Sequence, residues 1–474
     1  MWSVGLLCVG AVLAIGITHW IYKWRNPKCN GVLPPGSMGI PLIGEAIQLI
    51  IPSHSLELPP FLKHRLKRYG SIFRTNVAGR PVIVTADPEF NYFLLQQHGK
   101  LVESWSLDTF AKVFAQDSRI DRAHVQKYVR SLVLNHFGAG SIREKLLPQF
   151  HEVVRETLCA WSRQDSLEMK SAAAKMTLDF GAKQLFSYDP EEWPEKLSDL
   201  FKNFEQGLMS LPLNIPGTAH HRCLMNHKKV SNMMRDELRR RLASTDKRHQ
   251  EDLLDHFIRD MNTEQFLAED FIVQHMFGFL FIIFDSVSTS IALAIKLLAE
   301  HPLVLEELTA EHEAILKNRE NPDSPITWEE YKSMTFTLQV INETLRLANI
   351  APGMFRKAIK EINVKGYTIP EGWVIMLATS AQHLNSDKFE NPLEFKPSRW
   401  KNLESSVIAK NFMPFGSGLK QCAGSEYSRV IIATLLHVLV TKYSWTKING
   451  CEIMRSPIIR FPNGFHFKVS EKIN

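Results

Sequence analysis

The segment 415–424 gathers an aromatic residue, three glycines, a cation and one cysteine within ten residues. A helical pattern starts at Ser425, so the positive end of a helix points at Cys422 and favours its thiolate form. Phe415 would shield the sulfur. Lys420 would place a cation close to where the propionates of a haem should lie. The segment therefore favours Cys422 as a thiolate ligand of haem iron, an arrangement suited to O–O cleavage and oxygen insertion.

The glycines of this segment have a matching purpose. Gly418 and Gly424 permit tight turns and let backbone N–H groups approach the sulfur. The alternative is a glycine-rich turn with an unpaired core cysteine. A nucleotide-binding loop is disfavoured, because the third glycine of a dinucleotide fingerprint and the GK[ST] ending of a phosphate loop are both missing.

Two further segments carry motifs that agree with this interpretation. Glu343 and Arg346 stand three residues apart and share one face of a helix, which we expect to begin at the capping box 327–330. Arg399 follows in the segment FKPSRW. Taken alone, such a Glu–Arg pair is typical of an exposed helix surface. Together with the cysteine segment, these motifs resemble the cytochrome P450 family of haem-thiolate monooxygenases.

The resemblance extends over nearly the whole chain and implies a mainly α fold with small β-sheets around haem b. It also implies a reaction that uses O₂ and electrons from NADPH, delivered by a reductase. In the family, Glu343, Arg346 and Arg399 would form a buried charge network, a structural lock behind the haem. Residue patterns predict helices over 127–136, 265–300 and 425–442 and a strand over 81–85.

The longest predicted helix is apolar almost all round, and the resemblance implies that it crosses the open face of the haem. The family pattern there is a small residue, glycine, any residue, an acid and threonine, whereas this chain has IIFDS over 282–286. Asp285 and Ser286 would relay protons, or would make ordinary polar contacts in a buried helix. Ile282 and Ile283 would border the substrate; Ile283 either crowds the site or reshapes it.

Two arginines are candidates for holding the haem propionates. Arg130 and Arg356 carry guanidinium groups that match carboxylates and keep their charge when buried. Lys420 would neutralise the same groups. Each arginine has the alternative of being a surface cation.

The chain opens with an apolar stretch that is long enough to cross a bilayer. Basic residues follow this stretch and none precedes it, which favours a membrane anchor over a cleaved signal peptide. We expect a transmembrane anchor over 1–24, a basic, proline-rich hinge over 25–41 and a catalytic domain over 42–474. The expected location is the endoplasmic reticulum membrane, single-pass, with the catalytic domain in the cytosol.

The net charge of +6 suits an acidic redox partner or anionic membrane lipid, and no basic, aromatic-rich patch indicates nucleic-acid binding. The six cysteines lack CxxC spacing, so a reducing compartment is the simpler interpretation.

The expected substrate is hydrophobic. Trp105, Phe110 and Phe114 would supply aromatic walls, or would belong to the core, and 213–218 would face the membrane. The runs 328–335 and 366–370 resemble the plant clan that acts on brassinosteroids and on triterpenes such as thalianol-like or cucurbitane skeletons. Alternatives are a brassinosteroid or other steroid hydroxylase, a haem-thiolate isomerase or lyase that needs no O₂, and a haem protein without turnover.

Overall fold

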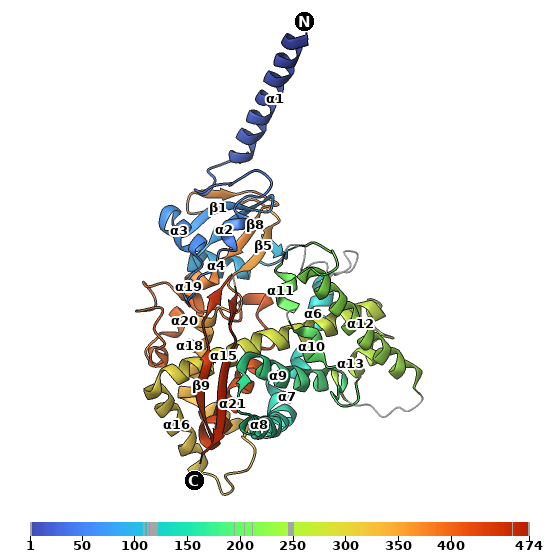
Figure 1. The fold of residues 1–474 in the computed structure, drawn as a ribbon, viewed down its shortest axis with the longest axis vertical. Coiled ribbons are helices and arrows are strands. Elements are labelled where there is room, and N and C mark those ends of the chain that lie inside the picture. The colour runs from blue at the N-terminus through green and yellow to red at the C-terminus, as the bar shows by residue number, and fades with distance from the viewer. Residues whose placement is uncertain are drawn as a thin grey trace.

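The computed structural model is mainly helical with small sheets, as expected (Figure 1). It describes residues 2–107, 110, 113, 122–193, 195–202, 204–210, 212–244, 251–456 and 458–472. The α-helices are α1 (Trp2–Arg25), α2 (Ala46–Leu49), α3 (Pro60–Tyr69), α4 (Pro88–Gln96), α6 (Arg122–Phe137), α7 (Ala139–Ser141), α8 (Leu147–Ser162), α9 (Met169–Phe186), α10 (Leu197–Phe201), α11 (Phe204–Leu208), α12 (Ala219–Ala243), α13 (Leu253–Asp260), α14 (Glu269–Ile282), α15 (Ser288–Glu300), α16 (Pro302–Lys317), α17 (Trp328–Ser333), α18 (Thr335–Ala348), α19 (Thr379–His383), α20 (Ser405–Asn411) and α21 (Ser425–Lys442). Short π-helices are η1 (Ile142–Leu146) and η2 (Ile283–Val287), and short 3₁₀ helices are η3 (Pro397–Lys401) and η4 (Gly418–Lys420).

The strands form four sheets among the described residues. They are β1 (Ile72–Val77), β2 (Arg80–Thr85), β3 (Val102–Ser104), β4 (Leu167–Glu168), β5 (Met354–Ala358), β6 (Ile362–Val364), β7 (Tyr367–Ile369), β8 (Val374–Leu377), β9 (Tyr443–Gly450), β10 (Met454–Arg455), β11 (Ile459–Arg460) and β12 (Phe465–Glu471). The largest sheet has the order β1-β2-β8-β5-β3, and β2 runs parallel to β8 with Val82 opposite Val374. A second sheet has the order β4-β12-β9, so the last strand of the chain lies in its middle.

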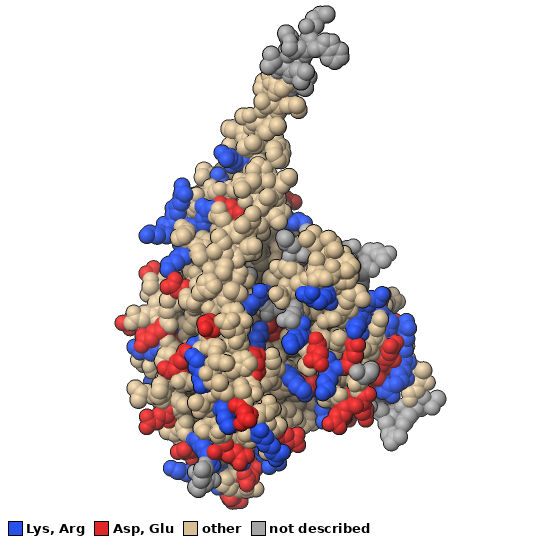
Figure 2. All heavy atoms as spheres, viewed as in Figure 1, with Lys and Arg blue, Asp and Glu red and all other residues tan. Residues whose placement is uncertain are grey.

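Helix α1 projects away from the rest of the molecule (Figure 1). From residue 10 onward most of its side chains are exposed, and its last turn carries Lys23 and Arg25. Figure 2 shows almost no charge on the described part of this helix above that basic turn. Its length and exposure are those that an anchor requires.

The central helix, defined here as α14, η2 and α15 together, runs through the core. Every residue from Ser288 to Leu298 is buried, which accounts for its nearly continuous apolar sequence. Among the described residues, Glu269–Glu300 is the helical stretch with the length and apolar composition to cross a membrane, but most of it is buried within the protein. It begins at Glu269 and not at the expected residue 265. Its five-residue π segment, η2, was not expected either.

The helix expected to begin at the capping box and to carry Glu343 is in fact two helices. The capping box is confirmed, since Thr327 and Glu330 exchange both hydrogen bonds at the start of α17. That helix ends at Ser333, and Met334, with ψ of 65°, separates it from α18. By contrast, the pattern over 425–442 matches α21 at both ends.

Two buried histidines form a hydrogen-bonded chain between α16 and α21. The Nδ1 atoms of His312 and His437 lie 3.0 Å apart, and His312 Nε2 lies 3.0 Å from Thr337 Oγ1. Thr337 Oγ1 donates to Glu311 at 2.5 Å, so this hydroxyl accepts from His312 Nε2–H. His312 Nδ1 must then accept from His437 Nδ1–H. Burial lowers the pKa of both histidines, so both are neutral in the folded protein.

We expect thermal stability to fall as the pH drops below about 6.5, because the unfolded chain then binds protons that the buried His312 and His437 do not. Their contribution is fully present above that pH and is lost below it, by about 1.4 kcal/mol per pH unit for each histidine. Thermal unfolding between about pH 7 and pH 5 measures this slope. A His437→Leu variant should start less stable and decline less steeply. If the stability of the His437→Leu variant fell with decreasing pH as steeply as that of wild type, the buried histidine pair would not be the cause.

Candidate active site

Cys422 lies in the turn between η4 and α21, and the turn has a fixed shape. Its backbone N–H donates to the carbonyl of Phe415 at 2.8 Å and closes the loop. Gly418 has φ of +68°, and a Cβ there would lie 2.5 Å from the carbonyl oxygen of Leu95 on α4. Gly424 caps the start of α21. The turn therefore holds the sulfur at the N-terminal end of an 18-residue helix, close to α4.

Cys422 is an exposed residue whose thiol is nevertheless surrounded by protein. Burial raises the pKa of its thiol, while a hydrogen bond from the backbone of Gly424 and the charge of Arg130 lower it. Nevertheless Cys422 is exposed. These observations agree if the sulfur lies in a recess. The other cysteines whose side chains the structure describes are half-buried or buried: Cys29, Cys159, Cys223 and Cys451.

The basic side chains of Lys420, Arg356 and Arg130 gather beside Cys422. Burial, followed by the charges of Arg356 and Arg130, lowers the pKa of Lys420 to about 8. Arg356 is 7% exposed, and its buried Nε has no hydrogen-bond partner in the described part of the chain. Arg130 donates from Nη1 to the carbonyl of Gln421 at 2.5 Å. Within the described ranges, none of the three cations forms an ion pair, so the cluster carries positive charge that an anion with several oxygens would balance.

His98 belongs to the same cluster, although sequence patterns did not single it out. Burial lowers its pKa, as do the nearby charges of Lys420 and Arg356. Its buried Nδ1 lacks a hydrogen-bond partner among the described residues. His98 follows α4 closely in the chain, and only the contact between α4 and η4 brings it here. No local motif could have revealed it.

Glu343 lies at the centre of a buried charge network. Arg346 donates to both of its carboxylate oxygens, at 2.9 and 2.8 Å, and Arg399 Nε donates to Oε1 at 2.8 Å. The side chains of Glu343 and Arg346 are 0% exposed. Trp400 Nε1 adds a bond to Oε2 at 3.0 Å, which no sequence motif indicated. Arg346 also donates to the carbonyl of His383, so the network ties α18 to the segments around α19 and η3.

Ile282 and Ile283 face different sides of the central helix. Ile283 is 9% exposed and packs against Gly181 of α9, whereas Ile282 is 57% exposed. Ser286 lies one turn after Ile282, and its Oγ donates to the carbonyl of Ile282 at 2.6 Å. We call the side that carries Ile282 and Ser286 the open side. The structure thus places Ile283 in the core against α9, and not on the open side where we expected it to border the substrate.

Asp285 forms an ion pair with α9. Its Oδ1 lies 3.1 Å from Lys170 Nζ, and both side chains are about one-fifth exposed, at 19% and 21%. The same oxygen has no partner with hydrogen-bond geometry among the described residues, so the contact is electrostatic. Sequence patterns did not indicate Lys170.

The aromatic residues expected near the substrate are placed only in part. Trp105 is half-buried, packs edge-on against Phe355 at 5.5 Å and lies under the guanidinium of Arg80. Phe110 packs against the main core, and Phe114 lies outside the described residues.

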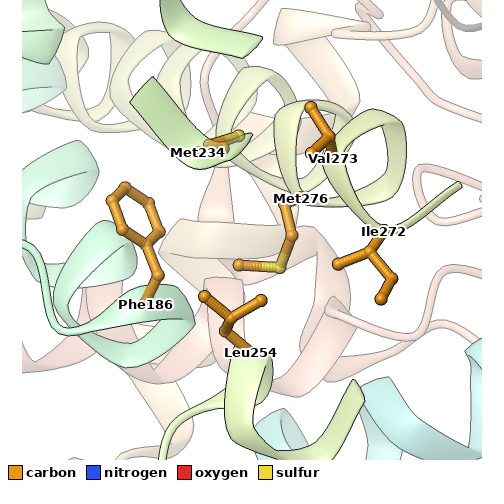
Figure 3. Close-up of a pocket in the computed structure, with 6 residues that line it drawn as sticks. All are labelled: Phe186, Met234, Leu254, Ile272, Val273 and Met276. Atoms are coloured by element: carbon orange, nitrogen blue, oxygen red, sulfur yellow. The ribbon is translucent and has the colours of Figure 1, made fainter. Parts of the chain in front are cut away.

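A further apolar junction lies where α9, α12, α13 and α14 meet (Figure 3). It has no space for a water molecule, so it is a packing seam and not a ligand site. Its walls come from Phe186, Met234, Leu254, Ile272, Val273 and Met276.

Comparisons with known proteins agree with this geometry. The sequence model of the family described as Cytochrome P450 matches residues 34–463. The chain is 48% identical over 475 residues to the beta-amyrin 16-alpha-hydroxylase CYP87D16 of Maesa lanceolata, and 48% identical over 474 residues to the cucurbitadienol 11-hydroxylase of Siraitia grosvenorii; each match covers 100% of both chains. The structure of the retinoic acid-bound cyanobacterial CYP120A1 has the same fold, with a TM-score of 0.82, 22% identity and coverage of 94% of this chain and 100% of that one. The chain belongs to the cytochrome P450 family.

Proposed function

We propose that this monooxygenase hydroxylates a triterpenoid. The observation that carries the proposal is the 48% identity, over the entire chain, to two relatives named as hydroxylases of beta-amyrin and of cucurbitadienol. The exposed apolar side chain of Ile282 in the middle of the molecule suits a substrate that binds mainly by apolar contact. Trp105, Phe110 and Phe114 remain proposed substrate contacts.

The residues around Cys422 fit haem b, the cofactor of the family. Cys422 would supply the thiolate ligand, and Gly418 and Gly424 add no side chain of their own to the turn that carries it. The cations Lys420, Arg356 and Arg130 would hold the two propionates, with His98 as a further donor. Haem, when bound through a thiolate, supplies an iron on which dioxygen is cleaved.

Replacing Arg356 with leucine should lower haem retention, because it removes a buried charge that no carboxylate of the described residues balances. We expect the ratio of haem to protein absorbance to fall and haem to transfer faster to apomyoglobin. Lys357→Gln, on the adjacent, partly exposed residue of β5, is the matched control and should retain haem as wild type does. If the Arg356→Leu protein retained haem as well as wild type does, Arg356 would not be a propionate ligand.

Ser286 and Asp285 are the residues we assign to proton handling. Ser286 Oγ holds its proton on the carbonyl of Ile282, and rotation about χ1 would turn the hydroxyl into the open side. Asp285 is held in an ion pair with Lys170. Its release from that pair would let its carboxylate exchange a proton with the hydroxyl of Ser286.

Partner and membrane assignments extend the proposal. Electrons from NADPH reach the family through a reductase, and a surface recess of about 360 Å³ beside Arg399 offers basic side chains to an acidic partner. The lysines in that recess are Lys388, Lys396 and Lys401.

We assign residues 1–24 to a transmembrane anchor, 25–41 to a hinge and 42–474 to a catalytic domain on the cytosolic face of the endoplasmic reticulum. The exposed helix α1 supports this assignment.

The test is co-expression of the chain in yeast with a plant reductase and separate synthases for beta-amyrin and cucurbitadienol. A product heavier by one oxygen atom, and labelled when the cells receive ¹⁸O₂, supports the proposal. Oxidation of sterols alone would favour a steroid hydroxylase. An unlabelled isomer would favour the isomerase alternative. The triterpenoid assignment would be overturned if the protein showed a normal reduced carbon monoxide spectrum and yet changed neither triterpene.

A further inference from the structure

Gly181, in α9, directly faces Ile283 of η2. A Cβ built on Gly181 would lie 2.9 Å from Cδ1 and 3.0 Å from Cγ2 of Ile283. The contact with Cδ1 is shorter than real Cβ contacts, and the one with Cγ2 is at the short limit, so a side chain at 181 requires Ile283 to shift. The family pattern has glycine where this chain has Ile283. In this chain the glycine is at position 181 of the neighbouring helix α9, where it leaves room for the side chain of Ile283.

The direction of Ile283 sets the direction of its neighbours. Successive residues of a helix are turned by roughly 100°, so with Ile283 against α9, Ile282 points elsewhere and is 57% exposed. Ser286 follows on the same side, bonded to the carbonyl of Ile282. The pair of Asp285 with Lys170 fastens η2 to α9 a second time. A π segment interrupts the regular α-helical hydrogen bonding, so packing contacts are needed to determine its rotation.

We propose that Gly181 is a positioning residue for the reaction site. Because it has no side chain, it admits Ile283 to the surface of α9 and thereby sets the rotation of η2 that turns Ile282 and Ser286 to the open side. This inference depends on the family's haem site and not on the choice of a triterpenoid substrate.

The experiment uses the full-length haem protein and imidazole, a small ligand that binds haem iron on the face opposite the cysteine. Gly181→Ala should push Ile283 away from α9 and so shift the open side of the central helix. We expect imidazole binding to weaken by about tenfold and the unfolding midpoint to fall by about 2–6 °C. Adding Ile283→Ala makes room for the new methyl group. The double variant should bind imidazole within about twofold of wild type. Gly140→Ala is the control, since a Cβ there meets no atom within 4 Å.

The readouts separate positioning from packing. A Gly181→Ala protein that unfolds at a lower temperature but binds imidazole as wild type does would show that Gly181 matters only for packing. That result would overturn the inference. So would a double variant whose imidazole affinity stays as low as that of the single one. Because imidazole binding requires no substrate, these results stand whether or not the chain oxidises triterpenes.

Discussion

Cys422→Ala is expected to abolish hydroxylation, with product falling at least about 100-fold. The variant loses the sulfur of Cys422, an exposed residue that stands just before the start of α21 beside the basic cluster. Without a thiolate ligand, the reduced carbon monoxide complex should lose the absorption band that marks sulfur ligation. Mass spectrometry of the extracted product and that spectrum measure the two effects.

Cys159→Ala is the matched control, because Cys159 is half-buried in α8 and lies outside the loop. It should retain both the spectrum and the product. Persistence of the thiolate-type band in the Cys422→Ala protein would assign the ligand to another residue and contradict the site as described.

Glu343→Ala is expected to be strongly destabilising, although Glu343 lies outside the cluster around Cys422. It strips the carboxylate from the buried Arg346 and from Arg399. Leaving an uncompensated buried charge costs about 3–5 kcal/mol of unfolding free energy. The N–H of Trp400 also loses its acceptor. Urea unfolding of the variant, together with its haem content after purification, measures the loss.

Two companion variants identify the cause of that loss. Arg346→Lys keeps the charge but cannot donate to both oxygens of Glu343, so we expect an intermediate stability. Glu329→Ala removes an exposed carboxylate from α17 and should change the unfolding free energy by less than about 0.5 kcal/mol. If Glu343→Ala unfolded at the same urea concentration as the Glu329 variant, the network would not be a structural lock.

The parts of this molecule that could be predicted are those specified locally. The run around Cys422 announces a turn followed by a helix, and the pattern over 425–442 matched α21 at both ends. The capping box at Thr327 formed as expected for the same reason, since both of its partners lie within four residues. The break at Met334 escaped prediction because nothing in the local residues forbids a continuous helix there.

What could not be predicted depends on contacts between distant segments. His98, Lys170, Gly181 and Trp400 enter the site through packing of α4 on η4, α9 on the central helix and η3 on α18. The substitution at Ile283 looked anomalous while its partner was unknown. Gly181 is more than one hundred residues away in the chain, and a glycine in a helix carries no sign of what it faces.

The position of β12 has a consequence for biosynthesis. This strand, Phe465–Glu471, pairs with β9 on one side and with β4 on the other, and it comes at the very end of the described chain. Because β12 is synthesised long after β4, the edge of β4 that pairs with β12 stays unpaired until β12 has left the ribosome. A chaperone that shields nascent strands, or substitutions that weaken the pairing of β12, should therefore influence the yield of folded enzyme.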